Sequence, residues 1–115
     1  MKLTPRILRA TYDRLRLFPP FSRWNLPTGT KIKFSVSAEV DCWAKVGQEP
    51  LQVVFSGPRP WSLASLDRTM AHEMIHVRQV ILGTLQDKEE KHHNLAFQKM
   101  AQSVCREFGF DPEAF

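Results

Sequence analysis

Apolar residues recur every three or four positions over the stretch from Ser62 to Leu82. The residues of this stripe are Leu63, Leu66, Met70, Met74, Val77 and Ile81. Such spacing places them on one face of a helix. Ser62 is a suitable N-cap, and Gly83 stands where a helix commonly ends. The pattern therefore predicts a helix between these two residues.

A shorter helix is predicted over residues 4–18. Thr4 can cap its start, and Pro5 suits its first turn because the amide hydrogen that proline lacks would have no helical partner there. The adjacent residues Pro19 and Pro20 then stop the helix.

A third helix is predicted over Asn94–Phe108, where apolar residues again follow the helical period and Gly109 marks the end. Its buried face would carry Phe97, Met100, Ala101, Val104 and Phe108. Asp87 and Glu90 could instead form a capping box that starts this helix earlier. Its beginning therefore stays open.

Alternation of apolar and polar residues predicts three strands between the first two helices. They cover Thr30–Ser37, Val40–Val46 and Leu51–Ser56, with Gly47 to Pro50 as a turn. The connections are only a few residues long, and short connections commonly join antiparallel neighbours. We therefore expect an α+β fold with a three-stranded, mainly antiparallel sheet arranged as a meander.

The length of 115 residues favours a single domain that covers residues 1–115. A hydrophobic content of 43% and a charged content of 24% are typical of soluble globular proteins. No apolar run approaches the roughly eighteen residues that a membrane span needs, and charges interrupt the apolar residues near the N-terminus. We therefore expect no membrane segment and a cytoplasmic location. Cys42 and Cys105 are then expected to be small buried residues with reduced thiols, and a disulfide between them is the alternative.

Basic residues are concentrated near the N-terminus. Residues 1–33 hold eight lysines and arginines against one aspartate, a net charge of +7, whereas the rest has eight basic and eleven acidic residues, a net charge of −3. One interpretation is a surface for DNA or another polyanion. The other is a solvated helix face that is basic without a partner.

The helix predicted after Ser62 contains the pattern H-E-x-x-H at His72, Glu73 and His76. Residues four apart lie on one helix face, so both imidazoles can reach one metal ion. Zinc accepts neutral imidazole nitrogen in a tetrahedral shell. Glu73 lies beside the same position, where a carboxylate can take a proton from metal-activated water. The pattern predicts two zinc ligands and a general base.

A catalytic zinc takes a third protein ligand, and the only other histidines are His92 and His93. Neighbouring side chains point in different directions, so one of the two is expected to bind. We favour His93, because it lies four residues before Phe97 and would share its side of the last helix. His92 is the alternative, and a carboxylate from Glu89 or Glu90 also stays open.

The H-E-x-x-H pattern followed by the segment His93–Phe97 resembles the SprT-like (Spartan-type) zinc metallopeptidases. That family pairs H-E-x-x-H with a later His-Gly-x-x-aromatic segment, and the resemblance covers about residues 30–108. It implies a zincin-like minimal metallopeptidase fold in which His72, His76 and His93 hold Zn²⁺. It also implies proteolysis, often of DNA-associated proteins.

The chain departs from the family pattern at two points. Asn94 stands where the family usually has glycine, although asparagine also accepts left-handed backbone and caps helices. We expect no counterpart of the C-terminal zinc ribbon that many bacterial relatives carry. Docking on DNA would then depend on the basic residues 2–33 or on a partner.

The leading hypothesis is a zinc metallopeptidase that hydrolyses peptide bonds through a metal-activated water, with Glu73 as general base. An exposed sheet edge could bind the protein or peptide substrate as an added strand. No oxyanion donor emerges, since Tyr12 lies in the distant first helix and Arg78 is expected to face solvent. One alternative is a non-catalytic, zinc-stabilised module that binds nucleic acid or protein. Another is a peptidase of the repressor-cleaving type with an acidic third ligand.

Overall fold

The first helix, α1, begins where the sequence predicts and ends earlier. In the computed structural model, which describes residues 1–39, 42–85 and 93–115, α1 spans Pro5–Arg16. The hydroxyl of Thr4 accepts a hydrogen bond from the amide of Ile7 at 3.2 Å, as expected of an N-cap. Leu17 and Phe18, which were expected to belong to the helix, lie beyond it and are exposed.

Two polar side chains of α1 hold the loop that follows. The hydroxyl of Tyr12 donates to the carbonyl of Pro27 at 2.6 Å, and the carboxylate of Asp13 accepts from the amide of Gly29 at 2.8 Å. A Cβ on Gly29 would lie 2.7 Å from that carboxylate, so the close approach requires glycine. The loop contains two short 3₁₀ turns, η1 (Phe21–Arg23) and η2 (Gly29–Lys31).

Three strands form one sheet: β1 (Lys33–Ser37), β2 (Ala44–Gln48) and β3 (Leu51–Ser56). β1 starts later than predicted because η2 occupies the residues before it. β2 extends through residues that were expected to form a turn, and positions 40–41 of the predicted strand lie outside the described residues.

The predicted antiparallel meander is wrong, because the sheet is mixed with the order β1-β3-β2. β3 lies in the middle, parallel to β1 and antiparallel to β2. Skipping one strand position requires a lateral step of about 10 Å. The connection of residues 38–43 can cover roughly twice that distance, so a short link did not oblige β1 and β2 to pair.

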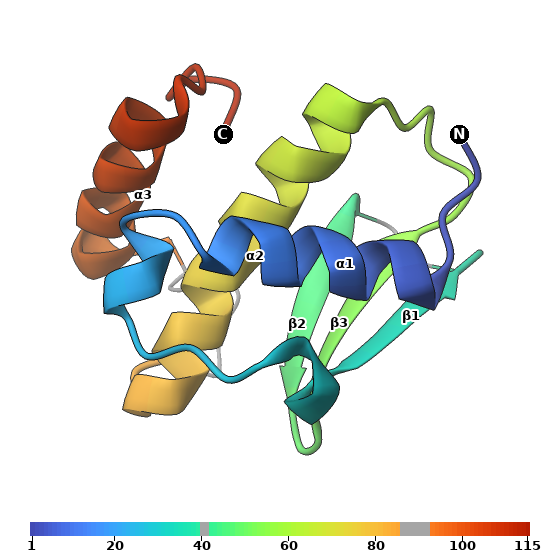
Figure 1. Cartoon of the computed structure of the whole chain (residues 1–115), viewed down its shortest axis with the longest axis horizontal. Helices are drawn as coiled ribbons and strands as arrows, with labels where there is room; N and C mark the ends of the chain where they lie inside the picture. Colours follow the sequence, from blue (N-terminus) through green and yellow to red (C-terminus); the bar gives the residue numbers. More distant parts are fainter. Residues whose placement is uncertain (40–41, 86–92) are drawn as a thin grey trace.

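The second helix, α2, spans Leu63–Leu82 and lies between the sheet and the third helix, α3, which spans Leu95–Phe108 (Figure 1). α1 packs against both α2 and β1. The middle of the predicted apolar stripe on α2 is buried, whereas its two ends, Leu63 and Ile81, are exposed. Because other elements surround α2 on several sides, its midsection can carry functional groups in a rigid frame.

The start of α3 is fixed by Asn94, whose side-chain oxygen accepts a hydrogen bond from the amide of Phe97 at 3.0 Å. The earlier start through Asp87 and Glu90 lies outside the described residues. α2 and α3 both end at a glycine in the left-handed conformation, Gly83 and Gly109, as their positions in the sequence predict.

Aromatic rings fill the space between the helices and the sheet. Tyr12 packs on Phe34 with ring centroids 5.5 Å apart, and Phe55 packs on Trp61 at 5.1 Å. Among the described residues, no helix combines the length and the apolar character needed to cross a membrane.

Candidate metal centre

The residues of the H-E-x-x-H pattern lie in the middle of α2. A capping box fixes the start of this helix: Ser62 and Ser65 each accept a hydrogen bond from the amide of the other, at 3.1 and 2.8 Å. His72 and His76 then fall one turn apart, with ring centroids separated by 5.1 Å. His76 is buried and His72 half-buried, so both rings line an opening rather than project into bulk solvent.

A third imidazole, that of His93, comes from the segment that leads into α3. The buried ring of Phe97 lies against all three imidazoles, with centroid distances of 4.4 Å to His93, 4.9 Å to His76 and 5.0 Å to His72. Phe97 therefore backs the whole cluster, and it shares a side with His93 as the sequence predicts.

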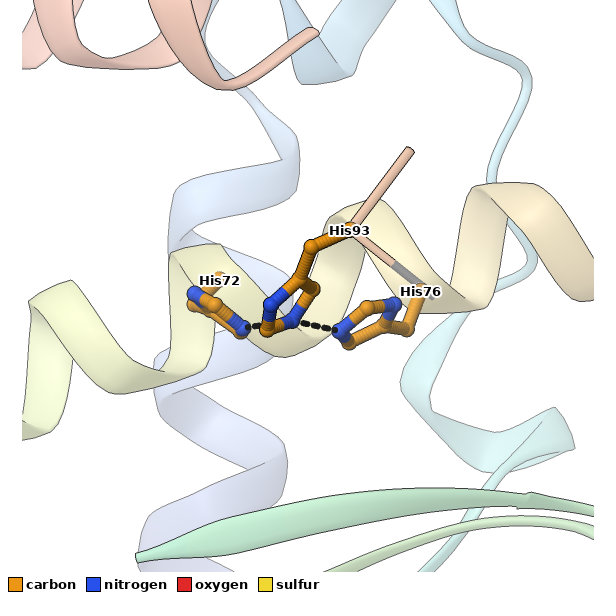
Figure 2. Close-up of side chains that lie close together, drawn as sticks. All are labelled: His72, His76 and His93. Atoms are coloured by element: carbon orange, nitrogen blue, oxygen red, sulfur yellow. Dashed lines mark hydrogen bonds between the residues drawn. The ribbon is translucent and has the colours of Figure 1, made fainter. Parts of the chain in front are cut away.

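The three Nε2 atoms converge on one point (Figure 2). The Nε2 atom of His93 lies 3.1 Å from that of His72 and 3.2 Å from that of His76, and one nitrogen from each ring lies within 4.8 Å of the others. Zinc in a tetrahedral shell would hold pairs of imidazole nitrogens about 3.4 Å apart. The cluster is thus nearly the size that one ion requires.

The Nδ1 atoms of His72 and His76, on the far side of each ring from Nε2, lie within hydrogen-bond distance of acceptor oxygens. The Nδ1 atom of His76 lies 2.7 Å from the side-chain oxygen of Gln79, and that of His72 lies 3.0 Å from the main-chain oxygen of Phe115. Such oxygens only accept hydrogen bonds, so each Nδ1 carries the proton. The Nε2 atoms of His72 and His76 both face Nε2 of His93, the side on which a cation would lie in a metal centre.

Burial controls the charge of the site. Desolvation, with a smaller effect of the neighbouring His93, lowers the pKa of His72 to about 4, although the hydrogen bond to Phe115 opposes this change. His72 is therefore neutral at physiological pH and can act as a ligand. Burial also raises the pKa of Glu73 to about 8. A cation at the three nitrogens would lower the pKa of this carboxyl again.

The cluster opens onto a cleft of about 810 Å³. Glu73 lines this cleft although only 4% of its surface is exposed. The other lining residues are Cys42, Trp43, Ala44, Lys45, Val46, Arg68, Thr69, His72, His76, Leu85, His93, Ala114 and Phe115. A cleft of this volume is large enough for several atoms of a substrate next to the three imidazoles.

The structure brings His72, Glu73, His76 and His93 together as the sequence predicts. The alternative ligands His92, Glu89 and Glu90 lie outside the described residues.

Two side chains that were considered as oxyanion donors lie elsewhere. Tyr12 is buried in the core with its hydroxyl on Pro27. The prediction that Arg78 faces solvent is wrong: it is half-buried, and its guanidinium donates to the carbonyl of Trp24. The reason is that the loop after α1 covers this side of α2. Neither residue lines the cleft.

Three residues of the site were not predicted from the sequence. Gln79 stands three residues after His76, a spacing that could have revealed it. Arg68 stands four residues before His72 and lines the cleft, so helical spacing could have revealed it too. Phe115 gives no such signal, because 43 residues separate it from His72.

Fold and site together define a small α+β protein with a three-histidine cluster that could hold a metal ion. No protein-family model matches the chain, and comparisons with curated proteins and with solved structures find no match.

Proposed function

We propose that this chain is a zinc-dependent metallopeptidase. The observation that carries the proposal is the convergence of three imidazole Nε2 atoms at the wall of a cleft that Glu73 also lines. Three histidines leave one position in a tetrahedral shell for water or substrate, whereas a structural zinc is usually closed by four protein ligands. The sequence resemblance to SprT-like peptidases points to the same chemistry.

The donor set favours zinc over harder cations, because magnesium and calcium prefer oxygen ligands. When bound, zinc would lower the pKa of a coordinated water and polarise a substrate carbonyl. Neutral His72, with its proton on Nδ1, suits this role without first losing a proton.

Glu73 would act as the general base and then as the general acid. Its carboxylate would take a proton from the attacking water and deliver it to the nitrogen of the leaving amine as the peptide bond breaks. Burial raises the pKa of Glu73 and a bound cation would lower it, so two opposing effects act on a group that must both accept and donate a proton.

The exposed edge of β2 would bind the substrate as an extended strand. Within the described residues β2 pairs with β3 alone, and residues of β2 line the cleft beside the histidines. A peptide that adds to this edge would run past the three imidazoles, held mainly by main-chain hydrogen bonds.

Substitution of Glu73 by glutamine tests the proposal. Glu73→Gln is expected to bind one zinc per chain like the parent, yet to cleave a casein-type substrate at least about 100-fold more slowly, because it cannot accept the proton. Glu107→Gln, on the exposed part of α3, is the matched control and should cleave normally. Cleavage by Glu73→Gln at the parental rate would contradict its role.

His93→Ala tests the third ligand. We expect it to lose stoichiometric zinc binding, because two histidines leave zinc under-ligated. Retention of one zinc per chain would instead favour a peptidase with an acidic third ligand.

A second candidate function is a zinc-stabilised module that docks on nucleic acid, and one observation favours it. Seven of the eight basic residues in 1–33 are exposed, the exception being Arg16. Such a surface could also direct a peptidase to DNA-associated proteins, so nucleic-acid contact and catalysis are compatible.

A further inference from the structure

The residues after α3 fold back toward the metal centre. α3 ends at Gly109, and the chain then turns from α3 toward α2 (Figure 1). Asp111 organises this turn, because its carbonyl accepts from the amide of Ala114 and its carboxylate from the amide of Glu113, both at 3.0 Å. The turn delivers Phe115 to the rim of the cleft.

A row of aromatic rings holds Phe115 in place. The ring of Phe108 stacks on that of Phe110 with centroids 5.6 Å apart, and Phe110 stacks on Phe115 at 5.9 Å. Phe108 is itself anchored on the buried ring of Phe21 at 5.6 Å. At the other end of the row, Phe115 lies 5.3 Å from the imidazole of His72. The segment is thus packed from the core of the molecule to a predicted metal ligand.

We propose that Phe115 is a positioning residue of the metal centre, whose main-chain oxygen fixes the tautomer and the orientation of His72. This oxygen lies 3.0 Å from Nδ1 of His72, and it cannot donate a proton whether it belongs to a peptide carbonyl or to an ionised terminal carboxylate. It therefore keeps the proton on Nδ1 and turns the Nε2 lone pair toward His76 and His93, 3.1 Å from Nε2 of the latter. Groups that orient a metal-binding histidine in this way raise the metal affinity of the site.

This inference rests on the proposed metal site, but it concerns a different part of the chain. The histidine cluster itself comes from α2 and the segment before α3, whereas the positioning group comes from the segment after α3. Gln79 provides the matching acceptor for His76 from within α2. Among the described residues of α2, none provides such an acceptor to Nδ1 of His72, so its orientation depends on Phe115.

The test compares the full chain with a variant that ends at Phe110 and therefore lacks the main-chain oxygen of Phe115. Zinc affinity is measured by competition with a chromophoric chelator, and folding by far-UV circular dichroism. Glu113→Gln is the control, because Glu113 contributes only its main-chain amide to the turn. We expect the shortened variant to bind zinc about 10- to 100-fold more weakly and Glu113→Gln to match the parent.

A second measurement needs no variant. Long-range ¹H–¹⁵N correlation spectra of the metal-free full chain report which nitrogen of His72 carries the proton, and we expect Nδ1. This measurement decides the matter if the shortened variant fails to fold.

A shortened, folded variant that binds zinc within twofold of the parent would overturn the inference, as would a proton on Nε2 of His72 in the metal-free chain. Failure of the parent to bind zinc would defeat the proposed function instead, while the tautomer of His72 would still decide whether Phe115 positions it.

Discussion

At the scale of single residues, Glu73 combines two properties that are seldom found together. It is 4% exposed, as a core residue would be, yet it borders the cleft beside the three imidazoles. Burial raises the pKa of its carboxyl to about 8, so the metal-free protein holds this group protonated at neutral pH. The proposed hydrolysis requires the ionised form of Glu73, and this form is unfavourable until a cation binds at the three imidazoles.

The cost of ionising buried Glu73 should appear in the pH dependence of the free energy of unfolding of the metal-free protein. The folded state retains a proton that the unfolded state releases near its ordinary pKa of 4.5, so the stabilisation from Glu73 is complete below pH 4.5 and is lost as the pH rises through about 8. Glu73→Gln stays neutral and should lose less stability over this window, by on the order of a few kcal/mol.

Urea unfolding of both metal-free proteins at several pH values between 4.5 and 8 measures this difference. His72 acts in the opposite direction, because its lowered pKa makes stability fall as the pH drops from 6.5 toward about 4. It is present in both proteins and cancels in the comparison. Parallel curves for the parent and Glu73→Gln would show that burial of Glu73 carries no such cost.

At the scale of elements, the edge of β2 beside the cleft is the surface most suited to an extended peptide. The amide of Ser56 donates to the carbonyl of Trp43, which makes this a hydrogen-bonded pair in the antiparallel ladder. Because such pairs alternate, Ala44 and Val46 direct their main-chain groups away from β3. Substrate would pair with these two residues.

Val46→Pro removes one outward amide while leaving the hydrogen bonds between β2 and β3 intact. We expect KM for a peptide substrate to rise severalfold, with zinc affinity unchanged, because the lost hydrogen bond belongs to substrate binding. Val46→Ala keeps the amide and serves as the control. An unchanged KM in Val46→Pro would place the substrate elsewhere in the cleft.

Substitutions on the outer face of α1 test whether the protein binds nucleic acid. Arg6 and Arg9 are exposed, whereas Arg14 is paired with Asp67 of α2. Arg6→Gln combined with Arg9→Gln should weaken duplex DNA binding and reduce the slope of log K against log salt by about 1.8, since each phosphate contact contributes about 0.9. Lys99→Gln on α3 is the control for net charge, and equal salt slopes for all three proteins would exclude α1 as the DNA-binding surface.

At the scale of the whole molecule, we expect the hydrophobic core to form without the metal ion. The core rings of Tyr12, Phe34, Phe55 and Trp61 pack between helices and sheet and do not line the cleft, although Phe97 joins the same core to the imidazoles. The proposed ion would lie at the wall of a cleft, where it joins α2 to the segment before α3.

Removal of zinc by a chelator should therefore leave the far-UV circular dichroism spectrum almost unchanged and abolish peptide cleavage. Tm should fall by an amount that depends on the concentration of free zinc, because the ion binds only the folded state. Re-addition of zinc should restore both Tm and activity. Cooperative unfolding on chelation would instead favour a structural metal and the binding-module alternative.

The boundaries of the helices were largely predictable because they depend on local chemistry. Thr4, Ser62 and Asn94 cap helices through hydrogen bonds within three residues, and Gly83 and Gly109 end them in the left-handed conformation. The sheet was predicted less well, because alternation identifies a strand but does not identify its partner. The pairing of β1 with β3, and not with β2, could not be read from this alternation.

The sequence by itself determined the separation of His72 and His76 and the position of Glu73 beside them, because the pitch of a helix fixes neighbours four residues apart. It also narrowed the third imidazole to two adjacent residues. Only the tertiary structure decided that His93 meets this pair, that Phe115 reaches His72 from 43 residues away, and that Glu73 is buried. These outcomes depend on how distant segments pack, and packing between distant segments leaves no periodic signal in the chain.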